Sequence, residues 1–266
     1  MKKENKRNDY EETFFSSPKN LSNSDFILQG LNNLRRITLD KKSHIKDYYK
    51  IRKMHQKIVN SMIDYHQSDK FKLKIDVDNI YEDGDLSNIK ESLHLIETGF
   101  NLETREGTQG LYDLLIYKNF PDMNSITEDF IKSHRYRKPE KIEFLHSMLD
   151  STIGLFEITK TDIHEGYAYL KEVFTGKEYQ IVDIGLSGNR NYDSIYIYSR
   201  LIKYHNITFN TGLNLLFNKK DGFMKKHIKK HKKNYSTEGE LLRFAQLYKY
   251  YSENPNRMKV HANNIL

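Results

Sequence analysis

Apolar residues recur at helical spacing through the N-terminal half of the chain. Those between Phe26 and Leu34 repeat every three or four positions and follow Ser24, a residue type that caps helix N-termini, so they predict a helix ending near Thr38. A stripe of isoleucine, methionine and tyrosine at similar spacing predicts a second helix over about 43–66. Together these two segments predict a helical hairpin.

Further helices are expected before residue 150. The apolar pattern predicts them over 88–99, 109–117, 126–132 and 139–149, the last with a proline at a permitted first-turn position. Between the hairpin and these helices, apolar and charged residues alternate strictly over 71–77. This period of two predicts a short, half-buried strand.

The hydrophobic period changes to two after Asp150. β-branched and aromatic segments separated by turn residues predict five strands, over 152–160, 166–173, 177–184, 194–203 and 207–211. Short strands packed this densely in the sequence are typical of a small antiparallel barrel or a strongly curled sheet. The alternation also gathers tyrosines on one face, which can be buried or receive a ligand: Tyr167, Tyr169, Tyr196 and Tyr198.

The predicted fold class is α+β, with four parts along the chain. They are a flexible arm over 1–22, a mainly helical region over 23–150, a small antiparallel β module over 151–217 and a basic helical C-terminal segment over 218–266. The last part begins with a lysine-rich stretch that has only a thin apolar stripe. A more apolar helix over about 241–251 follows it and should pack against the rest.

Positive charge is concentrated in that lysine-rich stretch. The 266 residues carry a net charge of +7, and residues 219–233, with eight lysines against Asp221, carry the same net charge. AT-rich codons favour lysine, asparagine, isoleucine, tyrosine and phenylalanine together, so a high lysine content alone indicates little. The clustering of the lysines is the feature that rises above this background.

Composition and motifs exclude several classes of chemistry. Without cysteine, the chain has no disulfide, thiolate nucleophile, iron–sulfur ligand or cysteine-based zinc site. No apolar run approaches the roughly 20 residues of a membrane span, and the charged first ten residues are unlike a secretory signal. We therefore expect a cytoplasmic protein with no membrane partner. No nucleotide-binding loop or catalytic set can be identified, so we expect no cofactor and favour a non-enzyme.

Two groups of residues suggest a metal site, but simpler interpretations fit them better. Four aspartates between Asp76 and Asp85 lack the glycine that a calcium-binding loop needs, and a solvated acidic turn explains them. His227 and His231 have the i,i+4 spacing of a helical metal pair, but the lysines around them oppose a divalent cation. We expect this pair to lie on a solvated basic face, and we expect no bound metal.

The β module resembles a known kind of domain. Residues 165–170 (Glu-Gly-Tyr-Ala-Tyr-Leu), 174–179 (Phe-Thr-Gly-Lys-Glu-Tyr) and 198–202 (Tyr-Ser-Arg-Leu-Ile) are similar to a β-rich module of uncharacterised bacterial proteins, some of which carry a C-terminal SEC-C metal motif. The resemblance covers about residues 153–217. It implies a β module and no particular reaction, and the metal motif is absent because the chain lacks cysteine.

The lysine cluster points to DNA or RNA as a partner. Lysine attracts phosphate rather than reading bases, and a run of lysines gives salt-sensitive, sequence-independent affinity for nucleic acid. Tyrosines exposed on the adjoining sheet can add a face on which bases stack. The predicted contact residues are Lys225, Lys226, Lys229, Lys230, Lys232, Lys233, Tyr196 and Tyr198.

Other interpretations remain open beside this one. The lysines can simply be a solvated helix face, with half of the tyrosines in the core. The predicted hairpin over 26–65 can make the chain a protein-interaction or scaffold module, as a homo-oligomer or with another protein. An enzyme is a further alternative, with its pocket between the helical region and the β module.

Overall fold

The fold is known from a computed structural model that describes residues 35–67, 105–117, 124–133, 138–189, 192–233, 235 and 239–254. The expected arm over 1–22, the strand over 71–77 and the helix over 88–99 lie outside these residues, as does most of the first helix of the predicted hairpin. Residues 35–39 are helical and lead through a short turn into the long second helix.

The helices described before residue 150 agree with the apolar pattern to within about one turn. They are α2 (Ser43–Gln67), α5 (Arg105–Tyr117), α6 (Ile126–Ser133) and α7 (Pro139–Leu149). Pro139 occupies the first turn of α7, where its missing N–H costs no hydrogen bond. The stripe of α2 predicted to face inward is buried at Ile45, Ile51, Ile58 and Met62.

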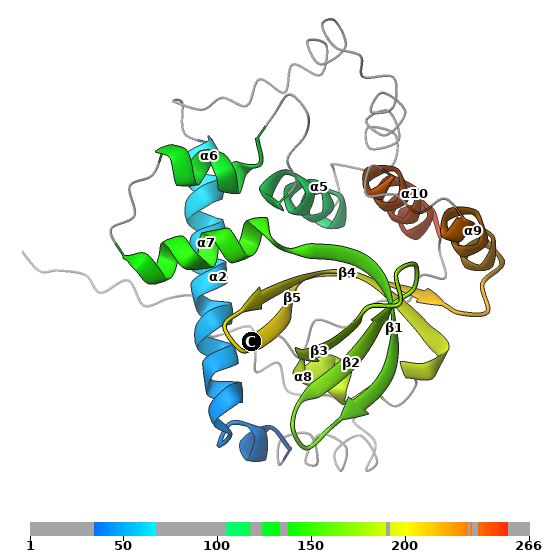
Figure 1. Cartoon of the computed structure of the whole chain (residues 1–266), viewed down its shortest axis with the longest axis horizontal. Coiled ribbons are helices and arrows are strands. Elements are labelled where there is room, and N and C mark those ends of the chain that lie inside the picture. The colour runs from blue at the N-terminus through cyan, green and yellow to red at the C-terminus, as the bar shows by residue number, and fades with distance from the viewer. Residues whose placement is uncertain are drawn as a thin grey trace, which may run out of the picture.

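Five antiparallel strands form one sheet in the order β3-β2-β1-β4-β5 (Figure 1). Their bounds are β1 (Thr152–Asp162), β2 (Tyr167–Glu172), β3 (Glu178–Val182), β4 (Ile195–Tyr204) and β5 (Ile207–Asn218). The first four agree closely with the predicted strands. The fifth strand continues well beyond the predicted end at Thr211. Gly212 adopts φ 108°, a conformation that glycine accommodates readily, and β5 pairs with β4 again from Asn214 onward.

The sheet is strongly curled but open, so the curled-sheet alternative is confirmed and the barrel alternative is wrong. β3 and β5 approach one another without pairing. The reason is that β3 ends at Val182 and gives way to the short helix α8 (Ile184–Ser187). Across the opening, the side-chain amide of Asn210 on β5 donates a hydrogen bond to the carboxylate of Asp183, which also caps α8.

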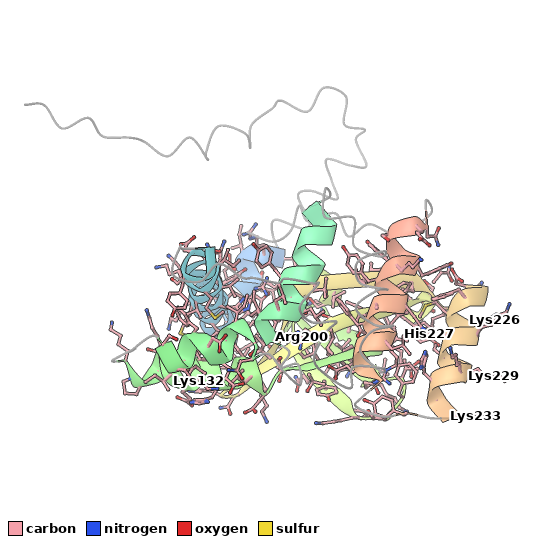
Figure 2. The ribbon with its side chains drawn as sticks, turned by 90° about the horizontal axis from the view of Figure 1, so that it is seen from above. Lys132, Arg200, Lys226, His227, Lys229 and Lys233 are labelled. Atoms are coloured by element: carbon pink, nitrogen blue, oxygen red, sulfur yellow. The ribbon has the colours of Figure 1, made fainter. Side chains whose placement is uncertain are left out.

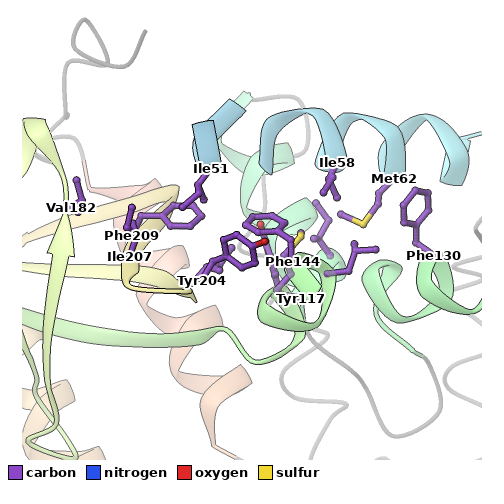
Figure 3. Close-up of a cluster of buried hydrophobic side chains, with 14 of the residues drawn as sticks. Ile51, Ile58, Met62, Tyr117, Phe130, Phe144, Val182, Tyr204, Ile207 and Phe209 are labelled. Atoms are coloured by element: carbon purple, nitrogen blue, oxygen red, sulfur yellow. The ribbon is translucent and has the colours of Figure 1, made fainter. Parts of the chain in front are cut away.

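Three hydrophobic clusters hold these elements together. The helix-side cluster joins α2, α5, α6 and α7 to β3, β4 and β5 through residues such as Ile58, Phe144 and Phe209 (Figure 3). The inner cluster fills the concave side of the sheet around Phe156. The α10-side cluster, around Phe244, joins β1, β4 and β5 to the C-terminal helices. The helical region and the β module therefore share their core.

The described part of the C-terminal segment contains a lysine-rich helix, α9 (Gly222–Lys233), and the more apolar α10 (Glu240–Glu253). They run beside each other, with α10 between α9 and α5 (Figures 1 and 2). None of the described helices combines the length and apolarity needed to cross a membrane.

Candidate functional sites: a lysine face and an aromatic cavity

All six predicted lysine contacts lie exposed on α9. Met224, His227 and His231 are buried on the opposite side of the helix, and Figure 2 shows Lys226, Lys229 and Lys233 pointing away from the body of the molecule. In the described part of the chain, no carboxylate forms an ion pair with any of the six. We call Lys225, Lys226, Lys229, Lys230, Lys232 and Lys233 the lysine face.

Side-chain contacts hold α9 in place so that this face points outward. Asp221, just before the helix, accepts a hydrogen bond from the backbone N–H of Phe223 at 2.7 Å and another from the hydroxyl of Tyr250 at 2.5 Å. The rings of Phe223 and Tyr250 stack with centroids 3.9 Å apart. Because Asp221 is occupied in this way, it caps the positive N-terminal end of α9 rather than neutralising the lysines.

His227 and His231 point inward, so the expectation that they lie on a solvated face is wrong. Burial, proximity to His231 and the charges of Arg243 and Lys230 lower the pKa of His227 to about 3. Burial also lowers the pKa of His231, whose ring nitrogen Nε2 lies 3.0 Å from Gln246 Oε1. Both imidazoles are therefore neutral near pH 7. Among the described residues, no cluster of three or more histidine or carboxylate side chains is arranged to hold a metal ion.

The structure corrects the predicted stacking face. Tyr198 is only 2% exposed and packs against Phe244 of α10, because the C-terminal helices cover this part of the sheet. It cannot receive a base. Tyr196 is partly exposed, with the ammonium group of Lys219 lying 5.4 Å from the centre of its ring. Of the two predicted tyrosine contacts, Tyr196 alone stays accessible.

A second feature is a cavity of about 550 Å³ between α2, α5, β5 and α10. Its walls are largely aromatic and aliphatic, with a few polar groups. It is lined by His55, Val59, Ile63, Tyr112, Asp113, Ile116, Tyr117, Thr211, Gly212, Leu213, Asn214, Leu215, Tyr248 and Tyr251. The cavity is about half open to its surroundings, and its volume is sufficient for a small organic molecule.

The wall of this cavity includes one half of a buried ion pair. Asp113 Oδ2 accepts a hydrogen bond from Arg200 Nε at 2.8 Å, and Asp113 Oδ1 accepts one from the hydroxyl of Thr211 at 3.1 Å. Arg200 also donates to Ser151 Oγ at 3.2 Å, and its guanidinium lies 4.8 Å from the centre of the Tyr117 ring. Burial by itself would lower the pKa of Arg200, but the charge and hydrogen bond of Asp113, together with Tyr117 and Glu240, outweigh burial and raise it. Asp113 and Arg200 thus form a buried salt bridge.

The sequence analysis did not predict this ion pair, although each of its residues interrupts an apolar pattern. Arg200 interrupts the apolar pattern of β4 between Tyr198 and Ile202, and Asp113 interrupts the apolar run of α5. A charge within a buried pattern needs a partner. The two residues are 87 positions apart, however, so only the fold identifies each as the partner of the other.

His55 and Tyr117 form a second polar contact beside the ion pair. His55 Nε2 lies 2.6 Å from the Tyr117 hydroxyl, and both side chains are buried. Burial and the nearby charge of Arg52 lower the pKa of His55 to about 3, so its ring is neutral near pH 7. Burial raises the pKa of Tyr117, so this hydroxyl keeps its proton.

Comparison with known proteins identifies the family. A model for a family of unknown function, DUF7986, matches residues 42–260. The chain belongs to DUF7986. The matched span of this DUF7986 chain extends from the start of α2 past the end of α10 and therefore includes both the lysine face and the cavity. No curated protein matches the chain, and neither does any solved structure. The family match names neither a SEC-C motif nor a bacterial source, so the resemblance to bacterial proteins that carry this motif stays a prediction.

Proposed function

We propose that this chain is a non-enzymatic, cytoplasmic protein that binds DNA or RNA through the lysine face of α9. The lysines attract backbone phosphates, so binding is largely independent of base sequence. Lys225, Lys226, Lys229, Lys230, Lys232 and Lys233 supply the contacts, and Tyr196 is the tyrosine that stays available for stacking.

The observation that carries this proposal is the arrangement of charge on α9. Six exposed lysines share one face of a twelve-residue helix, without an ion-pair partner in the described part of the chain. Lysines three and four positions apart repel one another, at a cost of a few tenths of a kcal/mol for each pair. A polyanion laid along the helix removes this repulsion, whereas solvent alone leaves it in place.

The test is fluorescence anisotropy with labelled single- and double-stranded DNA and RNA, at about 50 and about 200 mM salt. A quadruple variant replaces Lys225, Lys226, Lys229 and Lys230 with Gln. We expect the native chain to bind with micromolar or tighter affinity that falls steeply with salt. Because each lost phosphate contact lowers the logarithmic salt slope by about 0.7–0.9, the variant should lose about 3 units of slope together with most of its affinity.

A matched control replaces Lys46, Lys50, Lys53 and Lys57 on α2 with Gln. These four lysines are also exposed on a helix, and the change in net charge is the same. The control should retain nearly all of the affinity. Absence of binding at the lower salt, or an equal loss in the two variants, would refute the proposal, since total charge would then explain any attraction as well as the lysine face does.

The scaffold alternative remains a prediction without a specific observation in its favour. The apolar stripe of α2, which a partner would use, is buried against the chain's own sheet and helices. Measurement of molecular mass across a range of concentration tests self-association directly, and a strictly monomeric chain would count against it.

A further inference from the structure

The cavity beside Asp113 is separate from the lysine face and has a chemistry of its own. Tyr112 and Tyr117 of α5 and Tyr248 and Tyr251 of α10 contribute aromatic rings to its lining, and Leu213 lies among the aliphatic residues. Aromatic walls favour flat ligands, because ring faces and edges pack closely against one another. The shape and lining therefore suit a planar ring system.

Among the described lining residues, the carboxylate of Asp113 is neutralised by its ion pair with Arg200. Arg52, whose charge acts on His55, does not line the cavity. The depressed pKa of His55 leaves its ring uncharged near pH 7, and the raised pKa of Tyr117 keeps its hydroxyl protonated. A charged ligand would lose its hydration without gaining a countercharge, so an uncharged ligand is favoured.

The carboxylate of Asp113 at the wall can orient such a ligand. Among the described residues, each oxygen of Asp113 accepts one hydrogen bond, from Thr211 or from Arg200, and a carboxylate oxygen can accept a further one. Asn214 accepts a hydrogen bond from Ser199 at 2.8 Å, which holds its side chain on the face of the sheet that carries Leu216, opposite to Asp113. The polar group that the wall offers is therefore a strong acceptor on α5.

We propose that this cavity binds an uncharged planar nitrogen heterocycle, with an N–H of the ligand donating to Asp113 and the ring packed among the tyrosines. The buried ion pair supports this assignment. Such pairs contribute little to stability, and this one leaves Arg200 Nη2 without a hydrogen-bond partner among the described residues. The ion pair instead holds the carboxylate of Asp113 in a fixed position at the cavity wall.

The probe for the test is 2-aminopurine, a fluorescent, uncharged, planar heterocycle with an amino donor beside a ring nitrogen. The chain contains no tryptophan, so the probe can be excited with little background from the protein. Titration of the full chain should give a saturable quenching of the probe, because its ring stacks on tyrosine. Unlabelled adenine should compete with it, and saturating probe should raise the thermal midpoint of unfolding.

Two pairs of variants locate the binding. Val59→Phe fills the cavity from α2, and the control Asn60→Phe adds the same ring at the next, exposed position of that helix. Leu213→Phe fills the cavity from β5, so that a folding defect in one filling variant does not decide the result. Each filling variant should raise the dissociation constant at least about tenfold, while Asn60→Phe leaves it unchanged. Circular dichroism confirms that the variants fold.

The result that would overturn the inference is equally specific. Absence of saturable quenching up to the solubility limit of the probe, or equal affinity in the filling variants and the native chain, would show that the cavity does not bind this class of ligand. The inference does not depend on the lysine face. Val59→Phe should leave nucleic-acid affinity unaltered, so failure of one proposal can be told from failure of the other.

Discussion

At the scale of single residues, the ion pair between Asp113 and Arg200 is the most consequential interaction in the described core. Arg200 is 2% exposed and lies on β4 between Tyr198 of the α10-side cluster and Ile202 of the helix-side cluster. Replacing Asp113 with Leu leaves this guanidinium buried without its countercharge. We expect the free energy of unfolding to fall by about 3–5 kcal/mol, measured by urea denaturation.

A double-mutant cycle separates this effect from a change in packing. The variant that carries both Asp113→Leu and Arg200→Met removes both charges, so it should recover much of the stability that the single variant loses. A single variant that loses less than about 1 kcal/mol would show that solvent reaches Arg200 and that the pair is not buried in the way described.

At the scale of elements, the contact between α9 and α10 should weaken in acid. Burial and the charges of His231, Arg243 and Lys230 lower the pKa of His227 to about 3 from an ordinary value of 6.5. The unfolded chain therefore takes up protons at a pH where the folded chain does not, and stability falls as the pH decreases from about 6.5 towards 3. For a fully buried histidine the slope approaches about 1.4 kcal/mol per pH unit.

The measurement is urea denaturation at several pH values between about 7 and 5, above the range in which most carboxylates titrate. His55 on α2 contributes a similar dependence, since burial also lowers its pKa to about 3. His227→Phe should therefore remove part of the slope and His55→Phe another part. A slope that His227→Phe leaves unchanged would mean that this imidazole is protonated, and hence hydrated, in the folded chain.

The same elements show how far the sequence could predict the structure. The spacing of apolar residues and the turn-forming residues between segments predicted α2, α7 and the first four strands, because both features depend only on neighbouring positions in the sequence. They also predicted that the lysines share a helix. They failed for Tyr198, His227 and His231, because whether the face of a strand or helix meets solvent depends on what packs against it. The docking of α10 decides all three positions, and no local pattern encodes it.

The cavity lies beyond prediction for a related reason. Its walls come from α2, α5, β5 and α10, which are far apart in the sequence. Four tyrosines and an aspartate in apolar segments are compatible with an ordinary core, and only the fold shows that they line a half-open cavity. The sequence did suggest a pocket between the helical region and the β module, but it identified none of the residues that line it.

At the scale of the whole molecule, the shared core predicts that the described elements unfold together. Phe209 of β5 packs edge-on against Tyr48 and His55 of α2, and Phe144 of α7 packs against Tyr204 of β4. Helical region and sheet therefore stabilise each other through the same side chains. Far-ultraviolet circular dichroism, which follows the helices, and near-ultraviolet signals from the tyrosines should give coincident urea transitions.

The variant Phe209→Ala tests whether the helices and the sheet unfold together. Phe209 is fully buried, so its truncation should lower the free energy of unfolding by about 3–5 kcal/mol and shift both transitions by the same amount. Ile142→Ala, at an exposed position of α7, is the matched control and should shift neither by more than about 0.5 kcal/mol. If the helical signal were lost at lower urea than the tyrosine signal, the helices would be an independent unit, and the cavity between α2 and β5 would lie at a separable interface instead of inside one cooperative core.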